Sequence, residues 1–166
     1  MADDSQRIAS VTLEGQGVVR YAPDVERERT VAIYDLVEDN RFRPLPVEGA
    51  PGPAGPYDLH LETRENRLIL NIRCADGAPL APVTVPLAPF RRTVRDYFTI
   101  CESYYQAIRS ASPSQIEALD MGRRALHDEA ADELTGVLAP RVEIDRVTAR
   151  RLFTLICVLH IRGQGR

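Results

Sequence analysis

The chain has 166 residues, of which 44% are hydrophobic and 27% are charged. This length suits one ordinary domain, and the composition excludes an intrinsically disordered chain and a small domain that depends on disulfides. The formal net charge of −3, from 21 basic and 24 acidic residues, excludes a basic surface over the whole molecule, so we expect no nucleic-acid partner.

An export signal and a membrane segment are not expected either. The first residues, MADDSQR, lack the basic and apolar regions of a secretory signal. The longest apolar run, Leu155 to Leu159, is far shorter than the roughly 20 residues that a membrane helix needs. We therefore expect a cytoplasmic protein without membrane contact.

The first third of the chain predicts a strand, a helix and a loop. Residues 1–6 are expected to form a flexible tail, and the β-branched residues of Arg7–Leu13 predict a strand. A helix from Val25 to about Asp39 follows, because its apolar residues fall on one side. Residues 41–56 are rich in proline and glycine, which predicts a long exposed loop without helix or strand.

Three strand signals lie between Tyr57 and Leu87. The segments YDLHLET, RLILNIR and APVTVPL alternate apolar and polar residues, and short turn-like segments separate them. This pattern predicts an antiparallel meander with one apolar face. That face has to be covered, and only the helices that follow can cover it.

Three helices are predicted after the meander. The first begins at Pro89, and its apolar residues recur every three or four positions as far as Ile108. The residues from Ser112 to Gln115 form the capping-box pattern of the second. Asp145 suits the N-cap of the last helix, whose residues 152–159 are apolar on nearly every side. Such a helix is expected to be enclosed, either between the sheet and the other helices or in a subunit contact.

These elements together predict a single α+β domain over residues 1–166. Its small antiparallel sheet consists of the three-stranded meander plus the N-terminal strand. About four helices are expected to cover one face of this sheet, because one face of each strand is apolar and the other is polar.

Arginines cluster early in two of the predicted helices. Arg91, Arg92 and Arg95 begin one helix, and Arg150 and Arg151 lie in the other. Cations are mildly unfavourable at a helix N-terminus unless an anion is near, and the N–H groups there attract phosphate or carboxylate. Arg91, Arg92 and Arg95 are therefore candidates for binding a small anionic ligand. The alternative is pairing with protein carboxylates. The candidates for that pairing are Glu26, Glu28, Glu38, Asp39 and Glu102.

Asp120, Arg123 and His127 are the candidate catalytic residues. Their spacing puts all three on one helix face, within or beside its apolar stripe. Asp120 can orient either Arg123 or His127, and a carboxylate beside an imidazole is the minimum for general-base catalysis. The same arrangement also satisfies a half-buried histidine, and no nucleophile lies near it in sequence. Whether the protein is an enzyme therefore stays open.

Aromatic residues are concentrated on the helix that begins at Pro89. Tyr97, Phe98, Tyr104 and Tyr105 are more than a narrow apolar stripe needs. Core packing is one explanation for their number. The alternative is a self-complementary interface at Tyr104 and Tyr105, where two such helices pair about a two-fold axis in a homo-oligomer.

The familiar motifs of metal, nucleotide and hydrolase sites do not occur in the sequence, which contains no HExxH, GxGxxG, GxSxG or Walker pattern. We therefore expect no metal and no cofactor. Cys74, Cys101 and Cys157 are not spaced as CxxC, and free thiols among apolar neighbours commonly act as small hydrophobic residues. The sequence assigns no further role to Cys101 or Cys157.

Several stretches together resemble a bacterial protein family. They are Pro23-Asp24-Val25-Glu26, Val31-Ala32-Ile33-Tyr34-Asp35-Leu36, Glu65-Asn66-Arg67-Leu68, Pro89-Phe90-Arg91-Arg92, Asp96-Tyr97-Phe98, Ile100-Cys101-Glu102-Ser103-Tyr104-Tyr105, Asp120-Met121-Gly122-Arg123-Arg124 and Ala149 to His160. On these residues, which cover most of the chain from about Ala22 onward, the chain resembles the uncharacterised family UPF0262. The resemblance implies membership and a bacterial cytoplasmic setting, and it supplies no catalytic residue. The loop from Leu45 to Gly55 is longer than is usual in the family, so function is not expected there.

Two hypotheses for function follow from these patterns. The first is a non-catalytic binding or interaction protein that self-associates near Tyr104 and Tyr105. The second is an enzyme or sensor for a small anionic, phosphorylated metabolite, bound by the arginines of residues 91–95 with the Asp120 group nearby.

Overall fold

The computed structural model describes the backbone of residues 4–14, 23–46 and 52–164, and the side chains of these residues except 23–26, 28 and 160–164. The predicted tail 1–6 and the predicted loop 41–56 lie partly outside these ranges. The elements in chain order are β1 (Ile8–Leu13), α1 (Pro23–Glu38), β2 (Phe42–Pro44), β3 (Tyr57–Arg64), β4 (Arg67–Arg73), β5 (Val83–Pro86), the 3-10 turn η1 (Ala88–Phe90), α2 (Arg91–Ser110), α3 (Pro113–Leu138), β6 (Val142–Ile144) and α4 (Arg146–Gln164).

The main sheet has the strand order β1-β3-β4-β5. β3, β4 and β5 pair antiparallel, as predicted for the meander. The turn between β3 and β4 holds Glu65 and Asn66 at φ angles of 51° and 62°, which a two-residue type I′ hairpin turn requires. β1 pairs parallel with β3, so the predicted antiparallel pairing does not extend to this strand and the sheet is mixed. The chain passes through α1 between β1 and β3, and a crossover of this kind makes neighbouring strands parallel.

A second, two-stranded sheet pairs β2 with β6 antiparallel. The prediction that residues 41–56 contain no strand is therefore wrong at Phe42–Pro44. Phe42 is fully buried, its N–H donates to the carbonyl oxygen of Gln6 at 3.0 Å, and Arg43 lies 3.2 Å from the carboxylate of Glu143. A strand of three residues that ends in proline is too short to show an alternating pattern in the sequence.

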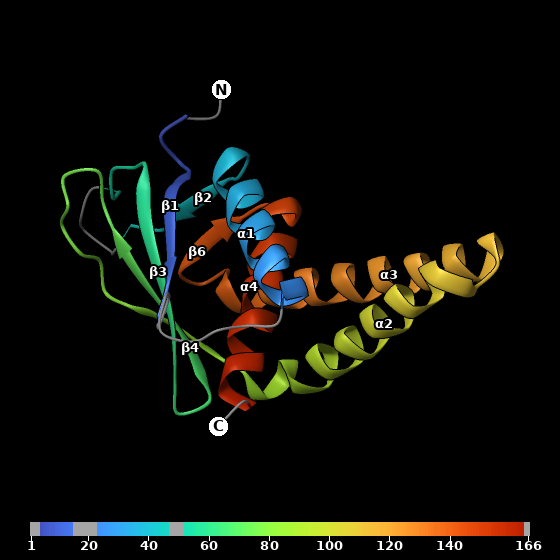
Figure 1. The fold of residues 1–166 in the computed structure, drawn as a ribbon. Coiled ribbons are helices and arrows are strands. Elements are labelled where there is room, and N and C mark those ends of the chain that lie inside the picture. Colours follow the sequence, from blue (N-terminus) through green and yellow to red (C-terminus); the bar gives the residue numbers. More distant parts are fainter. Residues whose placement is uncertain (1–3, 15–22, 47–51, 165–166) are drawn as a thin grey trace.

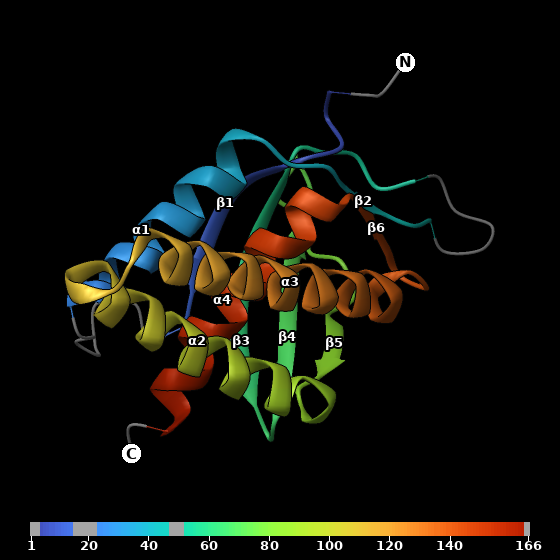
Figure 2. The same cartoon turned by 90° about the vertical axis from the view of Figure 1, so that its right-hand side faces the viewer.

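The helices α1 to α4 lie on one side of the main sheet, which confirms the predicted single covered face (Figure 1). α1 and α4 lie nearest to the strands, and α3 packs on α4 with α2 beside it (Figures 1 and 2). α4 is enclosed, as expected, and its residues from Leu155 to Leu159 are all buried. The inward side chains of β3, Tyr57, Leu59 and Leu61, are buried under these helices, whereas Asp58 faces the open side.

The N-termini of α3 and α4 confirm two predicted caps. The Ser112 side chain accepts the N–H of Gln115 at 3.4 Å, and the Gln115 side chain accepts the N–H of Ser112 at 3.1 Å, which is the capping box. The Asp145 carboxylate accepts the N–H of Thr148 at 3.0 Å at the start of α4. Both helices therefore begin where the local sequence indicated.

α2 and α3 form an antiparallel hairpin whose outer half projects away from the sheet (Figure 1). Gly122 lies where the two helices approach closely, since a Cβ atom at this position would be 2.6 Å from Cδ1 of Ile100. A side chain at residue 122 would therefore require the end of the Ile100 side chain to shift, which shows that α2 and α3 lie close together at this glycine.

Candidate functional site

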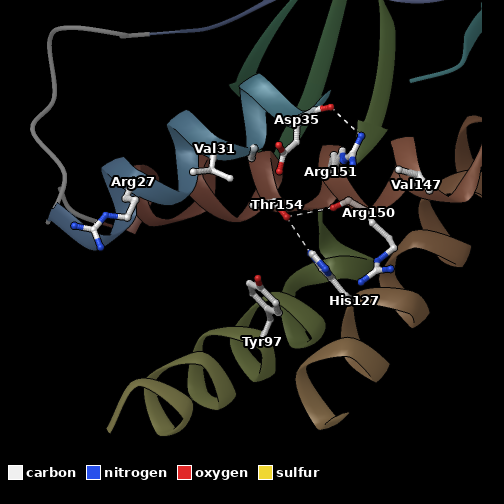
Figure 3. Close-up of a pocket in the computed structure, with 10 residues that line it drawn as sticks. Arg27, Val31, Asp35, Tyr97, His127, Val147, Arg150, Arg151 and Thr154 are labelled. Atoms are coloured by element: carbon white, nitrogen blue, oxygen red, sulfur yellow. Dashed lines mark hydrogen bonds between the residues drawn. The ribbon is translucent and has the colours of Figure 1, made fainter. Parts of the chain in front are cut away.

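A pocket of about 540 Å³ opens where α1, α2, α3 and α4 meet (Figure 3). Its lining consists of Arg27, Val31, Ala32 and Asp35 from α1, Tyr97 from α2, His127 from α3, and Val147, Arg150, Arg151 and Thr154 from α4. The volume lies within the range of roughly 300–1,000 Å³ that small-molecule sites occupy. Each of the helices contributes at least one side chain, so the pocket forms only after they have packed together.

Two stacked rings form one wall of this pocket. The centroids of Tyr97 and His127 are 5.0 Å apart and their planes differ by only 13°. Phe153 of α4 packs edge-on against both rings at 5.7 Å. Tyr97 and Phe153 are buried, so the imidazole is held between fixed aromatic neighbours and the α4 surface.

His127 is uncharged at neutral pH. Burial lowers the pKa of its imidazole from 6.5 to about 4, with further lowering by the charges of Arg150 and Arg123 and partial compensation by Asp128. The Thr154 hydroxyl lies 2.9 Å from Nε2 of His127 and 3.2 Å from the carbonyl oxygen of Arg150, one turn earlier in α4, and it hydrogen-bonds to both. Nε2 of the imidazole is therefore engaged within the protein.

The charged side chains of the pocket are mostly basic. Three arginines and one carboxylate, that of Asp35, line it. Arg151 donates from Nη1 to the carbonyl oxygens of Asp35 at 2.8 Å and Asp39 at 2.6 Å, which satisfies the last turn of α1 and fixes the guanidinium plane. Nε of Arg150 lies 3.4 Å from Oδ1 of Asp128, and both side chains remain more than a third exposed. The pocket therefore presents a positive rim beside an apolar and aromatic wall.

Asp120, Arg123 and His127 are not brought together as a catalytic group. Asp120 accepts a hydrogen bond from Arg123 at 2.7 Å, and its other carboxylate oxygen lies 3.0 Å from Nη2 of Arg124 in an ion pair. Burial lowers the pKa of Arg123, but the hydrogen bond and charge of Asp120 outweigh this effect and raise it. Of the two contacts that the spacing allowed for Asp120, the described hydrogen bonds include the one with Arg123, whereas His127 bonds to Thr154.

The arginines that begin α2 do not line this pocket. Arg91, Arg92 and Arg95 are not among its lining residues, and Nε of Arg92 lies 3.8 Å from the carboxylate of Asp96. The guanidinium groups of Arg91 and Arg95 form no ion pair with a residue in the described ranges. Of the two arginine groups predicted from helix starts, only the one on α4 contributes to the pocket.

The clustered aromatic residues of α2 divide between two environments. Tyr97 is buried in the pocket wall and Phe98 packs against the core. Tyr104 and Tyr105 lie farther out, on the projecting half of the hairpin, and Tyr105 is 41% exposed. The guanidinium carbon of Arg123 lies 4.5 Å from the centre of the Tyr104 ring, a cation–π contact.

The described residues form neither a metal-binding cluster nor a membrane-spanning helix. No group of three or more histidine, cysteine or acidic residues among the described residues is arranged to hold a metal ion. None of the helices in that part of the chain has both the length and the apolar content required to cross a bilayer. Cys74, Cys101 and Cys157 are buried and form no disulfide within the described residues, and burial raises the pKa of the Cys74 thiol.

Comparison with known proteins identifies the family. The model of the uncharacterised protein family UPF0262 matches residues 5–162. The chain belongs to this family. A UPF0262 protein of Bradyrhizobium sp. (strain ORS 278) is 53% identical over 163 residues, covering 98% of this chain and 95% of the relative. One from Sphingopyxis alaskensis is 56% identical over 164 residues, covering 98% of both chains. The resemblance seen in the sequence is thus confirmed.

Membership in UPF0262 places the chain in a bacterial family and brings no ligand or activity with it. No solved structure matches the chain.

Sequence patterns identified only part of the pocket in this UPF0262 chain. They singled out His127, Arg150, Arg151 and Tyr97, but not the residues from α1 or Thr154. Thr154 could have been identified from the sequence, because it is a polar residue within the apolar run LFTLICVL. A polar side chain in an enclosed helix needs a partner, and His127 is that partner.

Proposed function

We propose that this UPF0262 protein is a non-catalytic binding protein for a small organic anion, held in the pocket between the helices. The observation that carries the proposal is the lining, in which an aromatic and aliphatic wall stands beside three arginines and one carboxylate. Small-molecule sites are typically mostly apolar, with a few placed polar groups that fix the orientation of the ligand. A ligand with an apolar body and one carboxylate or phosphate group suits this lining.

The arginines support an anionic ligand in particular. Guanidinium groups recognise carboxylate and phosphate through two parallel hydrogen bonds, and they bind best when the group is already held in place. Arg151 is held by the carbonyl oxygens of Asp35 and Asp39, and Arg150 by Asp128. A phosphorylated metabolite would add negative charge where the lining is positive.

The low pKa and the hydrogen bond of His127 favour ligand binding over catalysis. A general base works best when its pKa is near the operating pH, and the pKa of His127 is about 4. Its Nε2 is already engaged by Thr154, and no carboxylate within the described residues orients it in the manner predicted for Asp120. The imidazole is therefore better suited to hydrogen bonding and stacking with a ligand than to proton abstraction.

A cytoplasmic location is part of the same proposal. Three buried cysteines that form no disulfide within the described residues are consistent with the reducing compartment in which disulfides rarely persist. Small phosphorylated and carboxylated compounds in that compartment are then the natural candidates for the ligand.

Thermal unfolding with matched probes tests the proposal. Phenyl phosphate and benzoate carry an apolar ring and an anionic group, whereas phenol and benzamide carry the ring without the charge. Binding to the folded state at ten times Kd is expected to stabilise it by about 1.4 kcal/mol, and the anionic probes alone should raise the melting temperature. Arg150→Gln should weaken phenyl phosphate binding roughly tenfold, because it removes a charge-assisted donor.

Arg124→Gln is the matched control for that variant. It makes the same change in charge, but Arg124 lies outside the pocket and pairs with Asp120. The proposal is wrong if the neutral probes stabilise the protein as much as the anionic ones, if no probe changes the melting temperature, or if both variants weaken binding equally.

A further inference from the structure

The projecting half of the α2–α3 hairpin has no core of its own. All residues from 102 to 124 are described, and none of them is buried. The apolar stripe of α2 nevertheless continues into this region, where Tyr105 is 41% and Ile108 is 52% exposed. Amphipathic helices are usually stabilised by burying such a stripe against another element. The outer half of α2 is therefore a surface that another chain can cover.

One face of this part of α2 carries a regular pattern of exposed side chains. Glu102, Tyr105, Gln106 and Arg109 follow at helical spacings of three, four and seven, and all of them are exposed. The carboxylate of Glu102 and the guanidinium of Arg109 form no ion pair with any described residue of the same chain. Opposite charges thus lie two helical turns apart on either side of Tyr105 and Gln106.

This pattern is complementary to itself in one arrangement. When two copies of α2 lie antiparallel about a two-fold axis that passes between residues 105 and 106, Glu102 of each copy lies opposite Arg109 of the other. Tyr105 of one copy then meets Gln106 of the other at the centre. A two-fold interface brings the same patch of both subunits together, so each contact is made twice.

We propose that two copies of this protein pair through the outer half of α2, with Tyr105 at the centre and reciprocal Glu102–Arg109 ion pairs on either side. The Tyr105 ring has an aromatic neighbour in its own chain. It packs against Tyr104 at 5.9 Å between ring centroids, and Tyr104 is itself covered by the guanidinium of Arg123. Aromatic side chains of this kind are typical of interface centres.

Charge-exchange variants test this pairing. Wild-type protein is expected to increase in mass with concentration in sedimentation or light scattering. Glu102→Arg and Arg109→Glu each place like charges opposite one another twice, and each should weaken self-association by about tenfold or more. An equimolar mixture of the two single variants should recover dimers, because positions 102 and 109 then carry opposite charges in both contacts of the mixed pair. The double variant Glu102→Arg/Arg109→Glu should also recover them.

Arg91→Glu is the control on the same helix, since Arg91 is exposed but lies far from the proposed axis. It should leave the association unchanged, and circular dichroism should show the same helix content for every variant. A wild-type chain that stays monomeric up to about 1 mM overturns the proposal, because a Kd above this range is too weak to matter. Failure of both the mixture and the double variant to recover dimers also overturns it.

Discussion

At the scale of a single residue, His127 makes the free energy of unfolding depend on pH. Its pKa is lowered from 6.5 to about 4, so between these values the unfolded chain binds a proton that the folded chain does not. The stabilisation present above pH 6.5 is therefore lost as the pH falls towards 4. Between about pH 7 and pH 4, wild type should lose roughly 3 kcal/mol more unfolding free energy than His127→Gln. Urea unfolding at several pH values measures this, and parallel pH curves for both proteins would contradict it.

Asn40 joins two elements through its side-chain amide. Its Oδ1 accepts the N–H of Ile8 at 2.7 Å, and its Nδ2 donates to the carbonyl oxygens of Ile8 at 3.0 Å and Leu36 at 2.6 Å. Asn40→Ala leaves these backbone groups without that partner at the start of β1 and the end of α1, which should cost about 2–3 kcal/mol. Chemical denaturation checks the value. Asn71→Ala, which removes one side-chain contact with Glu62 on the open face of the sheet, should cost less than about 1 kcal/mol. Equal losses of unfolding free energy for the two variants would show that the Asn40 contacts stabilise the fold no more than the Asn71 contact does.

At the scale of elements, the contact between Gly122 and Ile100 couples α2 to α3. Alanine favours a helix over glycine by about 1 kcal/mol, but a Cβ atom at residue 122 would meet Ile100. Gly122→Ala should therefore stabilise the Ile100→Ala protein by about 1 kcal/mol and the wild-type protein by clearly less. A double-mutant cycle of unfolding free energies measures the difference. Identical effects in the two backgrounds would mean that the helices do not meet closely here.

Elements were predictable from the sequence where local chemistry determines them. The Ser112 capping box, the Asp145 cap and the turn at Glu65 and Asn66 each depend on a few neighbouring residues, and all appear in the structure. β2 was missed because its partner, β6, lies about a hundred residues away along the chain, as the Arg43–Glu143 pair shows. The parallel pairing of β1 was also missed, because it depends on the path of the chain through α1 and not on the residues of the strand.

At the scale of the whole molecule, the pocket depends on how the helices pack and was only partly predictable. The helical pattern of α3 identified His127 as facing the core, but it suggested Asp120 as its partner because that residue is close in sequence. The partner found is Thr154, 27 residues away, because α4 packs along α3 and brings its hydroxyl to Nε2. Spacing on one helix can show which face a side chain occupies, and it cannot show which helix will cover that face.

Nuclear magnetic resonance of the His127 imidazole tests most directly whether an anion binds beside this residue. The chain has only three histidines, and His60 on the open face of the sheet, bonded to Thr12, serves as an internal control. With saturating phenyl phosphate, the pKa of His127 should rise above about 4, because the bound anion offsets the charges of Arg150 and Arg123 while burial, the main cause of the lowered pKa, remains. The His60 signal should not change with the probe. A His127 signal whose position and pKa are the same with and without phenyl phosphate would contradict the account.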